Sequence, residues 1–228
     1  MRSLLPPGVT VVETYEDVLD PSPFPEEEEA VARAVEKRRR EYATVRHCAR
    51  RALAELGFAP VAILNGARRE PLWPEGVLGS ITHCDGYRAA ALAREGTVAS
   101  LGIDAEPHEV LSPGVLALVM RPEEHGHLAR WAEERPGIAW DRVVFSAKES
   151  VYKAWFPLTR RWLDFEDATL HIDPWDGTFT AALHRPGPVV GGVRVSVMNG
   201  RWLVRDGLIL TSVVVPAPCT TPDSEPAS

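Results

Sequence analysis

The sequence predicts an α+β fold in which a helix followed by strands occurs twice, giving two similar halves that meet near residue 104. Two stretches, 31–56 and 140–155, place apolar residues at helical spacing. Short apolar runs separated by Gly-containing turns follow each of them, over 76–103 and over 168–215. The expected parts are an N-terminal half at 1–103, a C-terminal half at 104–215 and a disordered tail at 216–228.

Charged residues, proline and glycine set the expected ends of the helices. The first helix is expected to run unbroken from Glu26–Glu29, which suit the positive end of a helix dipole, to a stop at Gly57. The second is expected to start at Trp140 and to end at Pro157, because proline cannot donate the next helical hydrogen bond. A third helical pattern covers 114–135, and strands are expected at 79–83, 87–92 and 98–103.

The composition excludes several classes of protein. With 228 residues, 45% of them apolar and 25% charged, the chain suits one large or two small globular domains. A net charge of −7 argues against nucleic-acid binding, which relies on a positive surface. No stretch approaches the roughly 20 apolar residues of a membrane span, and the first residues contain no apolar run of signal-peptide length. Three cysteines without a C-x-x-C motif indicate neither disulfides nor zinc, so a cytoplasmic protein is expected.

Positive charge is concentrated in one segment of this acidic chain. Residues 30–70 hold ten Lys or Arg and four acids, which gives a local charge of +6. Arg38, Tyr42, Arg46 and Arg50 recur every four residues, so they form a stripe along the first helix. A solvated basic surface would account for any single arginine, whereas the stripe indicates a polyanionic small ligand.

Two carboxylates close the strand that ends the first half. Asp104 and Glu106 are two positions apart, so on an extended chain both side chains face the same side. Neighbouring carboxylates repel unless a cation lies between them, and such hard oxygen ligands suit Mg²⁺. Two solvated acids at a strand end are the simpler alternative.

Lysine is rare in this chain: only three of the 25 basic residues are lysines. Two of them, Lys148 and Lys153, lie in the second long helix, where Glu149 and Lys153 share one face. An ordinary surface ion pair would have this spacing. An ammonium can also donate a proton, which a guanidinium cannot, and a carboxylate beside it can act as a general base. The pair therefore favours phosphoryl-type transfer, and the strand ending in Thr82 and His83 suits a phosphate contact.

Taken together, these motifs resemble those of the 4′-phosphopantetheinyl transferases, in particular the larger class that acts on siderophore, peptide and polyketide synthases (the enterobactin- and surfactin-synthetase-activating type). The resemblance covers roughly residues 35–170. It rests on Arg38–Arg51, Pro71–Pro74, Gly79–His83, Leu101–Glu106 and Phe145–Ala154. The most specific features are the G-I-D-A-E strand and the F-S-A-K-E-S-V-Y-K helix, whose Asp104 and Glu149 are 45 residues apart.

The resemblance implies two α/β halves related by a pseudo-twofold axis, with the active site in the cleft between them. It implies a Mg²⁺-dependent transfer of 4′-phosphopantetheine from coenzyme A to a serine of an apo acyl or peptidyl carrier protein, with release of adenosine 3′,5′-bisphosphate. Asp104, Glu106 and Glu149 would hold Mg²⁺, or Mn²⁺, against the pyrophosphate. Of the catalytic residues Asp104, Glu149 and Lys153, Glu149 would take the serine proton and Lys153 would neutralise or protonate the departing phosphate. The implied coenzyme A contacts are Arg38, Arg46, Asn65, Arg68, Arg69, Thr82, His83, Lys148 and Lys153.

One part of the chain departs from the family pattern. Before Pro71 many relatives have Gly-Lys-Pro or Gly-Glu-Pro, whereas this chain has Arg69-Glu70-Pro71. Which of Arg68 and Arg69 meets a phosphate is therefore open.

A carrier-docking surface is expected at Trp155–Leu158 and Arg160–Arg161, with burial of Trp155 and Phe156 in the core as the alternative. A monomer is expected, since two fused halves complete one site. Two other functions fit parts of the pattern: a catalytically silent adaptor that binds coenzyme A or a carrier, and a Mg²⁺-dependent nucleotide phosphohydrolase.

Overall fold

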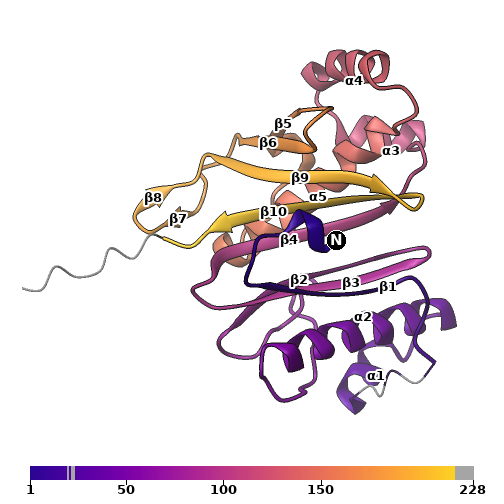
Figure 1. Cartoon of the computed structure of the whole chain (residues 1–228), viewed down its shortest axis with the longest axis vertical. Helices are drawn as coiled ribbons and strands as arrows, with labels where there is room; N and C mark the ends of the chain where they lie inside the picture. The colour runs from indigo at the N-terminus through magenta and orange to yellow at the C-terminus, as the bar shows by residue number, and fades with distance from the viewer. Residues whose placement is uncertain (20, 22–23, 219–228) are drawn as a thin grey trace, which may run out of the picture.

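A computed structural model describes residues 1–19, 21 and 24–218 of the chain (Figure 1). It confirms the α+β class: two antiparallel sheets each carry one helix of 20 residues. The helices are η1 (Arg2–Leu4), α1 (Pro25–Val31), α2 (Glu36–Glu55), α3 (Pro113–Val119), α4 (Pro122–Glu134), α5 (Trp140–Thr159) and η2 (Phe165–Asp167). The strands are β1 (Val9–Thr14), β2 (Val77–Cys84), β3 (Tyr87–Arg94), β4 (Val98–Pro107), β5 (Ala168–Ile172), β6 (Thr178–Leu183), β7 (Val189–Val190), β8 (Val193–Arg194), β9 (Val197–Arg205) and β10 (Leu208–Pro216).

The first half is a three-stranded sheet in the order β1-β3-β2, with α2 packed on one face (Figure 1). The other face packs against η1, β4 and β10, so the central strand β3 is covered on both sides. Every residue of β3 except Arg94 is buried, and four of the eight are alanines. Side chains this small let the layers on both faces approach closely, which places the second half directly against the first.

The expected single helix from residue 26 to 56 is wrong, because the chain breaks into α1 and α2 between them. Glu27 is buried and accepts hydrogen bonds from Arg50 at 2.7 Å and from the backbone N–H of Ile63 at 2.8 Å. On one straight helix, Glu27 and Arg50 would lie roughly 34 Å apart, at 1.5 Å per residue. Their ion pair therefore requires the chain to turn back, and no local sequence signal marks that turn.

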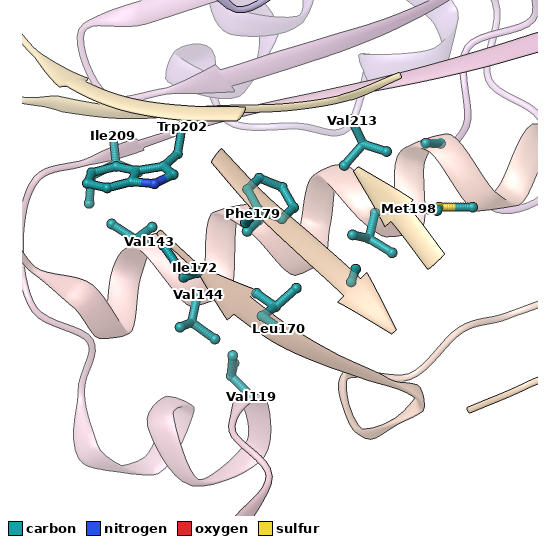
Figure 2. Close-up of a cluster of buried hydrophobic side chains, with 14 of the residues drawn as sticks. Val119, Val143, Val144, Leu170, Ile172, Phe179, Met198, Trp202, Ile209 and Val213 are labelled. Carbon is teal, nitrogen blue, oxygen red and sulfur yellow. The ribbon is translucent and has the colours of Figure 1, made fainter. Parts of the chain in front are cut away.

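The second half is a five-stranded sheet in the order β4-β10-β9-β6-β5, with α5 across one face. Figure 2 shows the core between them: Val143 and Val144 of α5 face Leu170, Phe179 and other apolar side chains of the sheet. β7 and β8 form a separate hairpin. None of the helices in the described part of the chain is long and apolar enough to span a membrane.

Prolines divide the helices of this half differently from the expectation. The pattern over 114–135 is two helices, since Pro122 occupies the first turn of α4 and starts a new element. Pro157 does not end α5, which continues to Thr159 and closes at Arg160 in a left-handed conformation. Within the last turn, a missing N–H costs one hydrogen bond, and the helix tolerates it there.

The two halves meet where the edge strands β2 and β4 lie side by side (Figure 1). In the described chain these two strands share no backbone ladder. Instead, the hydroxyl of Ser80 accepts a hydrogen bond from the N–H of Ile103 at 3.1 Å, and that of Thr82 accepts one from Ala105 at 3.0 Å. We call this arrangement the hydroxyl seam. Because side chains replace a ladder, the strands can diverge and leave room between the halves.

The sheets divide the chain before Val98, ahead of the expected boundary at residue 104, which falls inside the continuous strand β4. The expected tail begins at Pro216, which instead ends β10 opposite Val98. Residues 219–228, Cys219 among them, lie outside the described residues.

Replacing Glu27 by Ala is expected to lower the free energy of unfolding by about 3 kcal/mol, because Arg50 and the Ile63 amide both lose a buried partner. Urea unfolding followed by circular dichroism measures this loss. Glu28→Ala is the matched control, an exposed carboxylate on the same short helix. Equal losses in the two variants would contradict a structural role for the buried pair.

Candidate active site

A cleft of about 1050 Å³ lies between the two halves and is lined by residues from both. Most of the residues singled out in the sequence reach it, although they come from five separate segments. These are Arg38, Arg46, Asn65, Arg68, Arg69, Thr82, His83, Asp104, Glu149 and Lys153. Glu106 and Lys148 do not line it. The fold therefore gathers positive side chains of the first half and acidic side chains of the second around one space.

Asp104 lies at the centre of this arrangement, on β4 next to the hydroxyl seam. Its carboxylate is buried, and Oδ1 accepts hydrogen bonds from Lys153 Nζ at 2.7 Å and Thr82 Oγ1 at 3.3 Å. Oδ2 accepts a hydrogen bond from Ser146 Oγ at 2.8 Å. Helix α5 can bring these groups so close because Gly102 faces it: a Cβ there would lie 2.1 Å from the backbone oxygen of Ser150.

Lys153 connects the helix to the strand that carries Asp104. Its ammonium donates to Asp104 and, at 3.2 Å, to the backbone oxygen of Ile103. Burial alone would lower the pKa of Lys153, but the negative charge of Asp104 and their hydrogen bond raise it above its usual value. Lys153 is thus a permanently charged ammonium at neutral pH, fixed at the bottom of the cleft.

The two glutamates near Asp104 differ in their surroundings. Burial raises the pKa of Glu149; the charge of Lys153 opposes this shift, and that of Asp104 adds to it. In the described part of the chain Glu149 makes no hydrogen bond or ion pair, so its carboxylate is available to a ligand. Glu106 instead accepts a hydrogen bond from Arg142 at 2.9 Å. Burial, followed by the charge of Asp104, raises the pKa of Glu106 to about 7.

The acidic groups have the right chemistry for a divalent cation, although they are not arranged as a finished cage. Within 1–19, 21 and 24–218, no three His, Cys, Asp or Glu side chains lie close enough together to form a metal site. The charge of Asp104 raises the pKa of both Glu106 and Glu149, which is the repulsion that a cation would relieve. Mg²⁺ commonly binds one or two carboxylates together with substrate phosphates, so a site completed by its substrate is consistent with this donor set.

On the opposite wall, His83 stands among cations. Burial, and then the charges of Arg38, Lys153 and two further arginines, lower the pKa of His83 to about 4. The Arg38 guanidinium lies against its ring, and the carboxylate of Glu41 lies 3.7 Å from Nδ1. At pH 7 the imidazole is therefore neutral and lies in a positive field, which favours an anion in front of it.

Arg46 lines the cleft and holds the segment around Asn65 in place. It is buried, stacks on the ring of Tyr42, and donates to the oxygen of Ile63 at 3.0 Å and to Asn65 Oδ1 at 2.7 Å. It thereby holds the start of the loop that carries Arg68 and Arg69. Arg50, farther along the predicted stripe, pairs with Glu27 away from the cleft, so the stripe reaches the cleft only through its first members.

The loop after Asn65 is tightly folded. Glu70 folds back over Gly66, where a Cβ would lie 2.2 Å from its carboxylate, and accepts a hydrogen bond from the N–H of Arg68 at 2.8 Å. Arg69 has a φ of 66°, a left-handed conformation that costs a residue other than glycine about 1 kcal/mol. The loop thus exposes two arginines toward the cleft at an energetic cost.

The structure places Lys148 away from the cleft and decides between the two expectations for Trp155 and Phe156. Lys148, a residue of α5, is buried and donates to Glu124 of α4 at 2.6 Å and to two backbone oxygens. Its position does not support the prediction that it contacts coenzyme A. Trp155 and Phe156 are buried in the core, as the alternative for them held, whereas Arg160 is exposed. Thr82 reaches the cleft, but its hydroxyl is engaged by Asp104 and Ala105.

Two residues that no motif singled out lie next to the predicted acids: Arg142 binds Glu106 directly, and Thr211 of β10 is the ladder partner of Asp104. Arg142 also binds the backbone oxygens of Glu109 and Val110. Neither belongs to a recognisable motif, because each acts through a neighbour in space that is far away in the chain.

Cationic side chains that face a cluster of acids across one cleft suit an enzyme for a phosphate-bearing substrate, and comparisons with known proteins agree with this class. The family model of the 4′-phosphopantetheinyl transferase N-terminal domain matches residues 26–93, and that of the 4′-phosphopantetheinyl transferase superfamily matches residues 100–190. The chain belongs to the 4′-phosphopantetheinyl transferase superfamily. The first match ends and the second begins between residues 93 and 100, where the chain passes from the first sheet to the second.

Similar proteins with this activity cover nearly the whole chain. The 4′-phosphopantetheinyl transferase Svp of Streptomyces mobaraensis is 52% identical over 97% of this chain and 91% of its own length. The 4′-phosphopantetheinyl transferase PptT of Mycobacterium tuberculosis is 46% identical over 94% and 97%. Enterobactin synthase component D of Escherichia coli K12 is 35% identical over 52% of this chain and 55% of its own length. The chain accordingly transfers 4′-phosphopantetheine from coenzyme A to a carrier protein.

His83→Gln is expected to change how stability depends on pH. The pKa of His83 is about 4 in the folded chain against an ordinary value of 6.5, so the unfolded chain binds more protons between these values. The stability that neutral His83 contributes is complete above pH 6.5 and is lost as the pH falls toward 4. Between pH 7 and pH 4.5 the variant should lose less stability than the wild type, by on the order of 1–2 kcal/mol after allowance for partial exposure.

Urea unfolding at the two pH values measures this difference, with His125→Gln as the control for the loss of an exposed histidine. An unchanged pH dependence in His83→Gln would show that the imidazole is not held neutral by its surroundings.

Proposed function

We propose that the cleft binds coenzyme A with its nucleotide on the first half and its pyrophosphate at Asp104, and that the acids of the second half carry out the transfer. The observation that carries this proposal is the meeting of opposite charges at one point. Cations around His83 occupy one wall. On the other, Glu149 has no hydrogen bond or ion pair with any described residue, and Lys153 is paired with Asp104 between them. A catalytically silent adaptor would have no need of a desolvated, unpaired Glu149.

The 3′-phosphate of coenzyme A is proposed to lie against His83 and Arg38. Neutral His83 can donate one ring N–H, and Arg38 beside it supplies the charge. Arg46 and Asn65 support the nucleotide loop, and Arg69, held in its left-handed conformation, presents a guanidinium to the same region. Arg68 lies 6.0 Å over the ring of Trp162 in the second half, which favours Arg69 for the phosphate contact.

Mg²⁺, or Mn²⁺, is proposed to be held by Asp104 and Glu149, with Glu106 as the third carboxylate. When bound, the metal would neutralise the pyrophosphate and polarise its phosphorus–oxygen bonds. Glu106 is already paired with Arg142, and it does not line the cleft, so its oxygen is the least available of the three. Asp104 would hold the metal close to the ammonium of Lys153, with which it is paired.

Glu149 is proposed to take the proton of the carrier serine. Its raised pKa makes it a stronger base than an exposed glutamate, and the absence of a partner in the described chain leaves an oxygen free for the serine hydroxyl. Lys153 is proposed to neutralise the departing phosphate rather than to protonate it, because its raised pKa disfavours loss of its proton. Fixed charges of this kind supply most of the rate in phosphoryl-type transfer.

Each proposed residue belongs to this one chain, and each half contributes part of the set. We therefore propose a monomer as the active form. Arg160, exposed at the end of α5, is the proposed contact for an acidic carrier.

Incubation with coenzyme A, Mg²⁺ and a panel of apo acyl and peptidyl carrier proteins is expected to raise the mass of at least one carrier by one phosphopantetheine. Intact-protein mass spectrometry measures the gain, and the carrier with its acceptor serine replaced by alanine is the control. A chelator should abolish the gain. Full activity in its presence would remove the metal from the proposal, and no gain with any carrier would remove the proposed reaction.

Lys153→Arg is expected to lower kcat by about tenfold or more and to change KM for coenzyme A little. A guanidinium keeps the charge, but its planar fork cannot reproduce the point charge that contacts both Ile103 and Asp104. Steady-state kinetics with one apo carrier separate the two constants, and Lys37→Arg, exposed on α2, is the control. A raised KM with an unchanged kcat would mean that Lys153 only binds the substrate.

A further inference from the structure

Three buried hydroxyls lie behind the proposed metal site, between α5 and β10. Ser146, Ser150 and Thr211 are all fully buried. The Oγ1 of Thr211 lies 2.9 Å from Ser146 Oγ and 2.7 Å from Ser150 Oγ. It also donates to the backbone oxygen of Ser146 at 2.9 Å. This polar cluster interrupts an interface that is otherwise formed by apolar side chains of the second half.

The cluster ends on Asp104. Ser146 Oγ lies 2.8 Å from Asp104 Oδ2, and a carboxylate can only accept, so the single proton of Ser146 is committed to Asp104. Thr211 must then be the donor toward Ser146, with its single proton shared between the Oγ and the backbone oxygen of Ser146, and its own oxygen is left to accept from Ser150. The hydrogen bonds therefore run in one direction, from Ser150 through Thr211 and Ser146 to Asp104.

Backbone geometry fixes both ends of this series of hydrogen bonds. Thr211 pairs directly with Asp104 in the register of β10 and β4, so the two cannot move apart without breaking the ladder. Ser146 lies one turn before Ser150 on α5, and Gly102 lets that helix touch β4. A donor is thus held at a fixed distance from Oδ2 of Asp104.

We propose that Ser146, supported by Thr211, is a positioning residue that fixes the orientation of the Asp104 carboxylate. With Oδ2 bound to Ser146, Oδ1 is turned toward Lys153 and the cleft. The inference rests on the proposed role of Asp104 as a metal ligand. A carboxylate whose rotation is already restricted loses less conformational entropy when it binds a cation. Loss of a hydrogen bond to a metal ligand commonly changes metal affinity or activity by about 10–100-fold.

A structural role alone would not account for the arrangement. Apolar residues of similar size would fill the α5–β10 interface without unsatisfied polar groups, and such replacements are often neutral for stability. Hydroxyls are required at these positions only if the buried carboxylate of Asp104 needs a hydrogen-bond donor.

Mn²⁺ affinity, measured on the full chain by electron paramagnetic resonance titration, tests this proposal separately from catalysis. Ser146→Ala is expected to weaken Mn²⁺ binding and to lower kcat, each by about tenfold, while KM for coenzyme A stays near its wild-type value. Thr211→Val should have a smaller effect in the same direction, and Thr211→Ser, which keeps the hydroxyl, should restore wild-type behaviour. Because Thr211 acts through Ser146, the double variant should lose no more than Ser146→Ala alone.

Ser212→Ala is the matched control. Ser212 is the buried neighbour of Thr211 on β10, but its hydroxyl donates to Leu4 at 3.0 Å, away from Asp104. It should leave Mn²⁺ affinity and kcat unchanged. Asp104→Asn tests the proposed metal role itself and should abolish Mn²⁺ binding.

Loss of Mn²⁺ affinity in Asp104→Asn but not in Ser146→Ala would overturn the positioning role alone. Wild-type Mn²⁺ affinity in Asp104→Asn would overturn the metal role and this inference with it. Additive losses in the double variant would overturn the serial order of the hydroxyls. If Ser146→Ala does not fold, Ser146→Cys together with the Thr211 pair decides the same question, and equal Mn²⁺ affinity in Thr211→Val and Thr211→Ser overturns the proposal.

Discussion

The hydroxyl seam is the constraint on which the rest of the molecule depends. Two edge strands, β2 and β4, face each other, and backbone groups at such edges must find partners. Ser80 and Thr82 satisfy the N–H groups of Ile103 and Ala105, and Lys153 satisfies the oxygen of Ile103. The two sheets are thereby joined without merging into one. A merged sheet would have closed the space in which the cleft now lies.

The same seam explains how a chain with a net charge of −7 can offer a site for a polyanion. The positive segment around residues 30–70 belongs to the first half, while Asp104, Glu106 and Glu149 belong to the second. Across the seam the charges neutralise one another in part, and Lys153 of the second half serves as the common counter-ion of Asp104 and its neighbours.

Features set by neighbours in the chain could be predicted from the sequence, and features set by distant contacts could not. The β2 to β4 strands, α5 and the approach of Asp104 to Lys153 follow from alternation, helical spacing and the motifs. The break between α1 and α2 depends on the pairing of Glu27 with Arg50, and no residue between the two helices indicates a break in the sequence. Lys148 stands beside Glu149 in sequence, but helical geometry turns it to the opposite side, where Glu124 lies. Arg142 and Thr211 meet their acids only in the folded chain.

Gly102 and the two seam hydroxyls together set how far α5 stands from β2, and this has a consequence for how the enzyme can diverge. The width of the cleft depends on three small side chains, none of which contributes to the apolar core of the second half. Loss of the hydroxyl of Ser80 or Thr82 would leave the N–H of Ile103 or Ala105 without its partner, and a Cβ at Gly102 would lie 2.1 Å from the backbone oxygen of Ser150. The spacing between the halves is therefore held by residues that cannot change without a loss of stability, so new substrate preferences must arise at other positions of the cleft.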